Sequence, residues 1–127
     1  APIFIIAHSL GTIMISNYLW DMQKVGLLDK QIAGVYTTGS PLHIFLSGKR
    51  YSDIKAIEPT SDDFEWINFW NPKDVLSSPY RMLSSSYNKL VKDVRIKRGW
   101  FLESHGKYDS TSKVFKVIAE SISRITF

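Results

Sequence analysis

Three side chains of this chain, Ser9, Asp74 and His105, combine the chemistry of a nucleophile, an acid and a base. Each one comes shortly after a stretch of sequence that is typical of a β-strand. A serine hydroxyl becomes a competent nucleophile when an imidazole removes its proton and a carboxylate orients that imidazole. The order serine, aspartate, histidine therefore predicts covalent acyl chemistry at one site.

The residues around the serine follow the pattern small-x-Ser-x-small, formed by Ala7, His8, Ser9, Leu10 and Gly11. A sharp strand-to-helix turn that lifts a serine above a sheet needs small residues two positions away on either side. The first amides of the following helix have no intrahelical acceptor, so we expect the backbone N–H of Leu10 to bind a developing oxyanion. The alternative interpretation is a serine that simply caps the helix.

Three histidines are candidates for the base. We expect this role for His105, because it lies in a loop between a strand and the last predicted helix, a place suited to acid–base catalysis. His8 adjoins Ser9, but neighbouring side chains diverge at a sharp turn, so it is predicted to be a supporting residue. His43 either lines the pocket or faces water.

The expected acid is Asp74, which follows Pro72 by a short turn after a strand end. Its alternative role is that of an ordinary turn residue. Three other acids, Asp62, Asp63 and Glu65, precede the third predicted strand. Asp93 lies within a predicted strand, and Asp109 belongs to a loop or a helix cap.

Alternating strands and helices are expected to hold these side chains. Strands are predicted at 3–7, 32–41, 64–71 and 90–98. The run 3–7 has no polar member, which indicates a strand buried on both faces. The fold class is therefore α/β, a mostly parallel sheet with flanking helices, in which ligands bind beyond the carboxyl ends of the strands.

Helices are predicted over 10–25 and from Ser110 or Thr111 onward. In the first one, helical spacing places Ile15, Tyr18, Leu19 and Met22 on one buried face, and Gly26 is a plausible C-cap. The stretch 42–63 is predicted to be an irregular lid or substrate loop, and a short helix is predicted around Tyr80–Leu83.

The composition of the chain excludes several classes of protein and of chemistry. The chain has 127 residues, 44% of them hydrophobic, which suits a single globular domain. It has no cysteine, which excludes thiol chemistry, and no apolar run approaches the length of a membrane span. The segment Lys89–Arg98 alone carries a charge of +4, equal to the net charge of the whole chain. We interpret it as a solvated strand face, and the alternative is a basic patch that attracts phosphate or anionic lipid. The sequence shows no groove with interleaved aromatic residues of the kind that binds single-stranded nucleic acid.

These motifs together resemble the α/β-hydrolase family, in particular its lipase-like and esterase-like members. The similar stretches are "AHSLG", "TTGSPL", "WINFWNPKDVLSSP" and "ESHGKYD". The resemblance implies that residues 1–127 form one domain, the C-terminal portion of that fold, beginning at the nucleophile strand. It also implies Ser9 as nucleophile, Asp74 as acid, His105 as base and Leu10 as one oxyanion donor, with neither cofactor nor metal.

Two departures accompany the resemblance. Ala7 replaces the more frequent glycine, and the loop that would supply the second oxyanion donor should lie upstream of Ala1. We therefore expect strand 3–7 to form an apolar sheet edge. Such an edge could pair with an N-terminal half of the domain or with another copy of the chain.

The predicted activity is hydrolysis of a carboxylic ester, either a small molecule or a lipid, through an acyl-enzyme intermediate. The alternatives are a non-catalytic binding module on the same fold and an acyltransferase. No nucleic-acid partner is expected.

Overall fold

The computed structural model describes residues 2–28, 32–96 and 112–126, and within them four strands form one parallel sheet. The strands are β1 (Ile3–His8), β2 (Ile32–Thr38), β3 (Glu65–Trp70) and β4 (Val91–Arg95), and they lie side by side in sequence order. Every neighbouring pair is parallel, so the carboxyl ends of all four strands meet at one edge. The predicted α/β architecture is confirmed.

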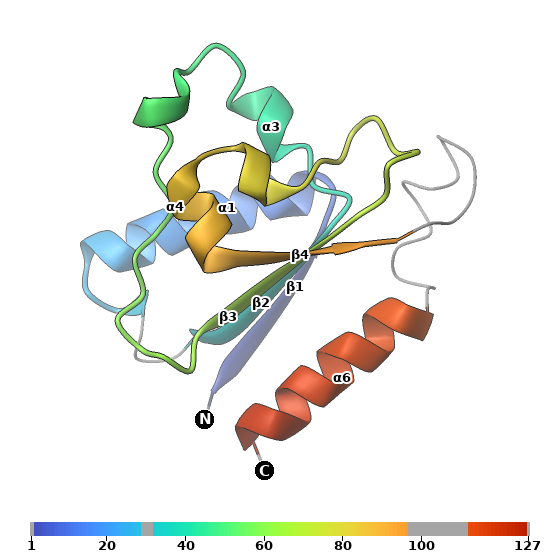
Figure 1. Ribbon diagram of the computed structural model, residues 1–127. Helices are drawn as coiled ribbons and strands as arrows, with labels where there is room; N and C mark the ends of the chain where they lie inside the picture. The colour runs from blue at the N-terminus through green and yellow to red at the C-terminus, as the bar shows by residue number, and fades with distance from the viewer. Residues whose placement is uncertain (1, 29–31, 97–111, 127) are drawn as a thin grey trace.

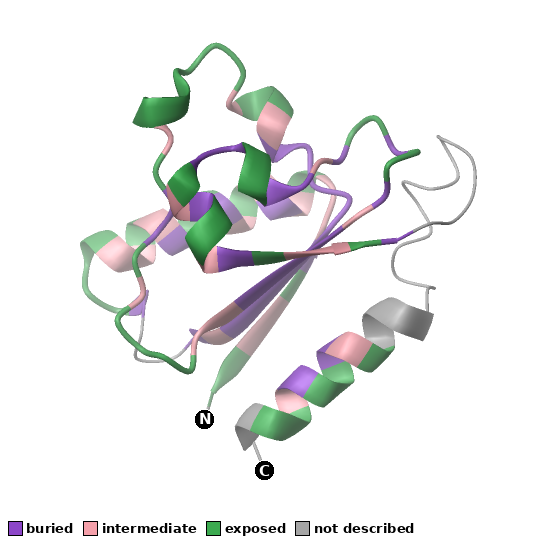
Figure 2. Cartoon of the chain, in the orientation of Figure 1, coloured by how far each residue is buried: buried purple, intermediate pink, exposed green. Residues whose placement is uncertain are grey.

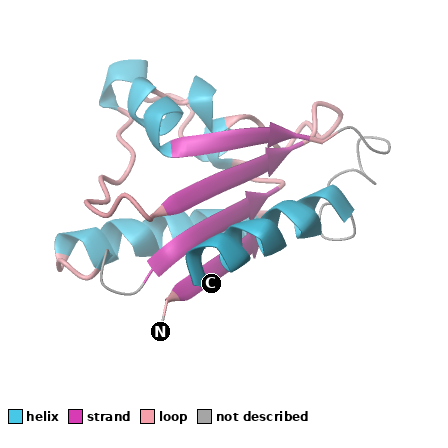
Figure 3. Ribbon diagram, turned by 60° about the horizontal axis from the view of Figure 1, so that its bottom comes forward, coloured by secondary structure: helices cyan, strands magenta, loops and turns pink. Residues whose placement is uncertain are grey.

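Helices cover both faces of this sheet. The helical elements are α1 (Leu10–Lys24), α3 (Leu42–Phe45), η1 (Tyr51–Asp53), η2 (Tyr80–Met82), α4 (Ser85–Leu90) and α6 (Ser112–Thr126). Helix α6 lies across one face, whereas α1, α3 and α4 lie on the other (Figures 1 and 3). A parallel sheet needs this double cover because both of its faces carry apolar side chains.

The larger core fills the space between the sheet and the layer that contains α1, η2 and α4. Leu19 and Val35 are fully buried there, and the rings of Trp66, Tyr80 and Tyr87 pack against one another. The ring centroids are 5.7 to 6.4 Å apart with near-perpendicular planes. This edge-to-face geometry stabilises the cluster beyond the burial of its area.

The opposite face of the sheet packs on α6. Tyr36, Ile67 and Phe69 point to this side and pack with Ile118 of the helix. Residues alternate along β2 and β3 between the two cores, as the pleat of a strand requires. The central strands are buried along their length in Figure 2, which fixes the register that aligns their carboxyl ends.

The prediction that strand 3–7 is buried on both faces is wrong for the described chain. Strand β1 is an edge of the sheet, paired only with β2, and Ile3 and Ile6 are 43% and 55% exposed. Burial of an edge strand depends on what lies beside it, which the apolar run itself does not specify. The expectation of an apolar sheet edge at this strand is confirmed.

Helix α1 begins at the predicted residue and ends at Lys24, one residue before the predicted end, but its buried stripe differs from the predicted one. The buried residues are Thr12, Ser16 and Leu19, whereas Tyr18 is 46% exposed. Ile15 and Met22 pack only partly against the core. The hydroxyl of Thr12 faces inward and contacts the Ser9 carbonyl and the Ser40 hydroxyl, whereas that of Ser16 is buried without a hydrogen-bond partner among the described residues.

The segments outside the sheet were predicted less completely. Within 42–63 the chain is mostly irregular, as expected, with only short turns of helix at α3 and η1. The predicted helix around Tyr80 is the single turn η2, and α4 was not predicted. Gly26 has a φ of 74°, and its amide bonds to the carbonyl of Gln23, in agreement with the predicted helix end.

Candidate functional site

Ser9 lies in the turn between β1 and α1 with a strained backbone. Its φ and ψ are 54° and −125°, and it is the one non-glycine residue with positive φ in the part of the chain that the structure describes. Its amide donates to the carbonyl of Thr38 at 3.0 Å, so the ladder between β1 and β2 continues into the turn. Strain of this kind persists only where the surroundings hold it, and it concentrates at functional sites.

A helix-capping role does not account for Ser9. Its side chain makes no capping hydrogen bond, and a capping serine usually has extended backbone angles. Leu10 is the first residue of α1, so its amide has no acceptor within the helix. A Cβ placed on Gly11 would meet no atom within 4 Å, so the described chain does not show the crowding that the predicted small-residue requirement implies at this position.

A chain of buried hydroxyl groups ends in a hydrogen bond to the backbone carbonyl of Ser9. The Thr12 hydroxyl donates to the Ser9 carbonyl at 2.6 Å and lies 2.8 Å from the Ser40 hydroxyl, which lies 2.5 Å from that of Tyr80. Because each hydroxyl carries one proton, a consistent arrangement has Tyr80 donating to Ser40 and Ser40 to Thr12. Burial raises the pKa of Tyr80 far above its usual range, which keeps this terminal donor protonated.

His8 contacts β2 through its side chain. Its Nδ1 lies 3.0 Å from the hydroxyl of Thr38, and that hydroxyl is 3.3 Å from the carbonyl of Ala7. This contact links the residue before the serine to the neighbouring strand. It suits the supporting role that the sequence predicted for His8.

Asp74 lies in the turn after β3, at the same edge of the sheet as Ser9. The residue is only 1% exposed, and its carboxylate accepts a hydrogen bond from the amide of Leu76 at 3.0 Å. The amide of Asp74 donates to the carbonyl of Asn71 at 2.9 Å. Its backbone position is therefore fixed by the turn, while its carboxyl group is withdrawn from solvent.

His43, the alternative imidazole, lies near that carboxylate. Burial lowers the pKa of His43, while the charge of Asp74 acts in the opposite direction. Its Nδ1 is buried and has no hydrogen-bond partner among the described residues. The structure thus brings the His43 imidazole into the electrostatic range of the predicted acid. His105 lies outside the described residues.

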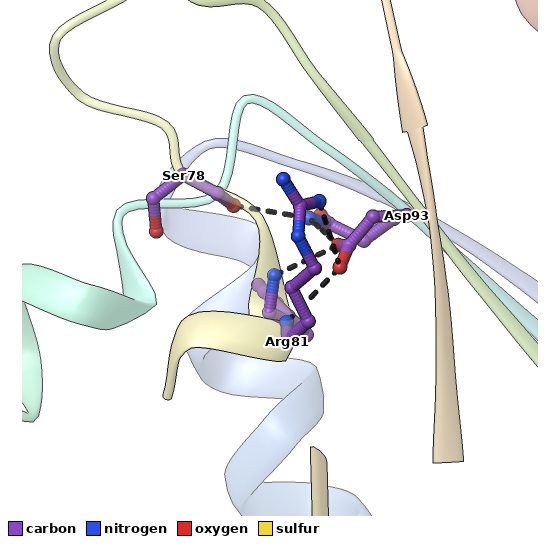
Figure 4. A network of polar contacts seen from close by, with 5 residues as sticks. Ser78, Arg81 and Asp93 are labelled. Carbon is purple, nitrogen blue, oxygen red and sulfur yellow. Dashed lines mark hydrogen bonds and ion pairs between the residues drawn. The ribbon is translucent and has the colours of Figure 1, made fainter. Parts of the chain in front are cut away.

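Asp93, which the sequence placed on a solvated strand face, is instead a buried centre of polar contacts. Its side chain is 4% exposed, and its carboxylate accepts from the amides of Tyr80 and Arg81 at 2.8 and 3.0 Å. It also accepts from the side-chain amide of Asn68 at 3.0 Å, and the Arg81 guanidinium lies 3.7 Å away (Figure 4). Asn68 donates in addition to the carbonyl of Ser78.

This network missed by the sequence reasoning has a structural role. It attaches η2 to β3 and β4 and so fixes the position of Tyr80, whose hydroxyl begins the chain of hydrogen bonds that ends at the Ser9 carbonyl. An aspartate within an alternating strand has no local signal for burial. Only the position of η2 above β4 reveals its partners.

Comparison of the sequence with protein-family models and with curated proteins found no match. Among residues 2–28, 32–96 and 112–126, every helix is too short or too polar to cross a bilayer. The same residues contain no group of three or more potential metal-ligating His, Asp or Glu side chains.

Proposed function

We propose that this chain carries the nucleophile, the acid and the base of a serine hydrolase of the α/β-hydrolase type, which cleaves carboxylic esters. The observation that supports this proposal most strongly is the strained backbone of Ser9 between β1 and α1. An ordinary serine at a helix start would have no reason to adopt positive φ. A nucleophile elbow requires such a turn, because it raises the hydroxyl above the sheet.

In the proposed reaction, Ser9 Oγ attacks the ester carbonyl carbon while His105 accepts the hydroxyl proton. The amide of Leu10 donates to the resulting oxyanion. The tetrahedral intermediate collapses as His105 passes its proton to the leaving alcohol. Water then attacks the acyl-enzyme with His105 again acting as base, and Ser9 regains its proton.

Asp74 is proposed to orient the protonated imidazole and stabilise its charge. Its burial supports this role, because a carboxylate withdrawn from water interacts more strongly with a neighbouring cation. Its position after β3 places it at the carboxyl edge that also carries Ser9. The nearby imidazole of His43 is the rival base, so the proposal needs an experiment that separates the two histidines.

The test is covalent labelling with a fluorophosphonate, together with hydrolysis of a short-chain nitrophenyl ester. Labelling should be lost in Ser9→Ala and retained in Ser47→Ala, a control at an exposed serine. His105→Gln should slow labelling by at least about 100-fold, whereas His43→Gln should change it little. Labelling that persists in Ser9→Ala would refute the nucleophile, and the opposite histidine pattern would assign the base to His43.

A further inference from the structure

The hydroxyl of Tyr80 lies at the far end of the chain of hydroxyl groups that reaches the Ser9 carbonyl. It is 2.5 Å from the Ser40 hydroxyl, which is 2.8 Å from that of Thr12. The Thr12 hydroxyl is in turn 2.6 Å from the carbonyl oxygen of Ser9. Tyr80 and Thr12 are fully buried, so bulk water does not compete for these contacts. We call the side chains of Tyr80, Ser40 and Thr12 the hydroxyl relay.

The acceptor at the end of the relay fixes the direction of its hydrogen bonds. A carbonyl can only accept, so the single proton of Thr12 goes to the Ser9 carbonyl. The Ser40 hydroxyl must then donate to Thr12, and at its contact with Tyr80 it can only accept. The amide of Leu42 also reaches the Ser40 oxygen, at the longer distance of 3.4 Å. The proton of Tyr80 therefore sets the direction of the whole relay.

The surroundings of Tyr80 hold its hydroxyl in place. Its backbone amide donates to the buried carboxylate of Asp93 at 2.8 Å. Its ring packs edge to face against the rings of Trp66 and Tyr87, with centroids 5.7 Å apart in both pairs. A ring fixed at both its backbone and its faces cannot swing its hydroxyl away from Ser40 without disturbing the core.

We propose that Tyr80 is a positioning residue for the nucleophile Ser9. By donating to Ser40, it keeps the Thr12 proton directed at the Ser9 carbonyl, which lies in one planar peptide with the Leu10 amide. Without the Tyr80 hydroxyl, the Thr12 proton can turn to Ser40 instead. That peptide then loses one of the two donors from Thr12 that hold it. The inference rests on the proposed function, because Leu10 affects the reaction only if an oxyanion forms beside it.

The first test is the rate of fluorophosphonate labelling, measured well below the unfolding temperature of each variant. Tyr80→Phe should slow labelling about tenfold, less than the roughly 100- to 1,000-fold loss caused by removing an oxyanion donor outright. Tyr87→Phe is the matched control, because it removes a hydroxyl outside the relay from the neighbouring buried ring. It should leave the rate within about twofold of the parent. Equal rates in the two variants would overturn the proposal.

A double variant then separates positioning from a general loss of stability. If Tyr80 acts on Ser9 through Thr12, Tyr80→Phe should slow labelling no further once Thr12→Val has cut the relay. Two effects that multiply would mean that Tyr80 acts by another route, which would refute the proposal.

A measurement without any reaction keeps this inference separate from the proposed function. The ¹³C chemical shift of the Ser9 carbonyl reports the hydrogen bonds that this oxygen accepts. In Tyr80→Phe it should move toward its value in Thr12→Val, and in Tyr87→Phe it should stay at the parent value. An unchanged shift in Tyr80→Phe would refute the relay, whatever the labelling shows. Labelling that persists in Ser9→Ala would instead refute the proposed function and leave the relay standing.

Discussion

The hydroxyl of Thr12 donates a 2.6 Å hydrogen bond to the carbonyl of Ser9, one turn of helix earlier. The amide of Thr12 donates to the same carbonyl at 3.0 Å. Two donors on one oxygen hold the peptide plane that joins Ser9 to Leu10. That plane also orients the Leu10 amide, so the fully buried threonine supports the proposed oxyanion donor without contacting a substrate.

Thr12→Val should therefore reduce both stability and the reactivity of Ser9. The substitution keeps the shape but leaves the Ser40 hydroxyl with one partner fewer, at a cost of about 1–3 kcal/mol in the free energy of unfolding. Thr12→Ser keeps the hydroxyl and should restore the rate of fluorophosphonate labelling. Urea unfolding and labelling kinetics check the two effects. Equal labelling rates in both variants would contradict the positioning role.

The strain at Ser9 predicts an unusual order of stabilities. Ser9→Gly should be more stable than Ser9→Ala by about 1–2 kcal/mol, because glycine adopts positive φ without a steric penalty. The same pair at Ser47, where φ is not positive, should show no such advantage for glycine. Thermal unfolding of the four variants makes the comparison. An alanine variant as stable as the glycine variant would argue against a strained turn.

Asp93→Asn should be strongly destabilising. One oxygen that accepts from backbone amides would become an NH₂ group that opposes them, at a cost of about 2–4 kcal/mol. Asp53→Asn offers a matched control, because its ion pair with Arg50 is exposed and should be worth less than about 1 kcal/mol. Urea midpoints measure both variants. A similar small change in each would mean that the buried network contributes little.

Alkaline pH should lower the free energy of unfolding of the chain. Burial raises the pKa of Tyr36 and of Tyr87 from 10.0 to about 12. The unfolded chain loses these protons above pH 10 while the folded chain retains them, so stability is complete below pH 10 and falls between pH 10 and 12. Each group contributes on the order of 2–3 kcal/mol to that loss. Tyr36→Phe should flatten the decline measured by urea unfolding at several pH values, and Tyr51→Phe, at an exposed position, should not.

The exposed edge at β1 predicts self-association through Ile3 and Ile6. Ile6→Lys should shift the chain toward the monomer in sedimentation velocity, because a lysine on an edge strand opposes further strand pairing. Tyr51→Lys changes an exposed ring far from this strand in the sequence and provides the control. A parent chain that stays monomeric as its concentration rises would refute the prediction.

Apolar runs made the first two strands predictable, aromatic and β-branched residues the third, and an alternating pattern the fourth. The position of Ser9 was predictable because its strand and helix adjoin in the sequence. The inward hydroxyl of Thr12 was not, since its partner Ser40 comes from a segment more than 20 residues away. Asp93 was misplaced because an alternating pattern cannot show which polar residue lies beneath η2.

The sequential order of the sheet also bears on how the chain folds. Partners in register are 30 residues apart between β1 and β2 (Phe4 and Gly34), 31 between β2 and β3 (Gly34 and Glu65), and 25 between β3 and β4 (Trp66 and Val91). Each described strand pairs with the strand that precedes it in the sequence. During synthesis, each strand can therefore dock on its predecessor soon after it leaves the ribosome. The loops that these pairings close are of similar length, so each closure costs a similar entropy.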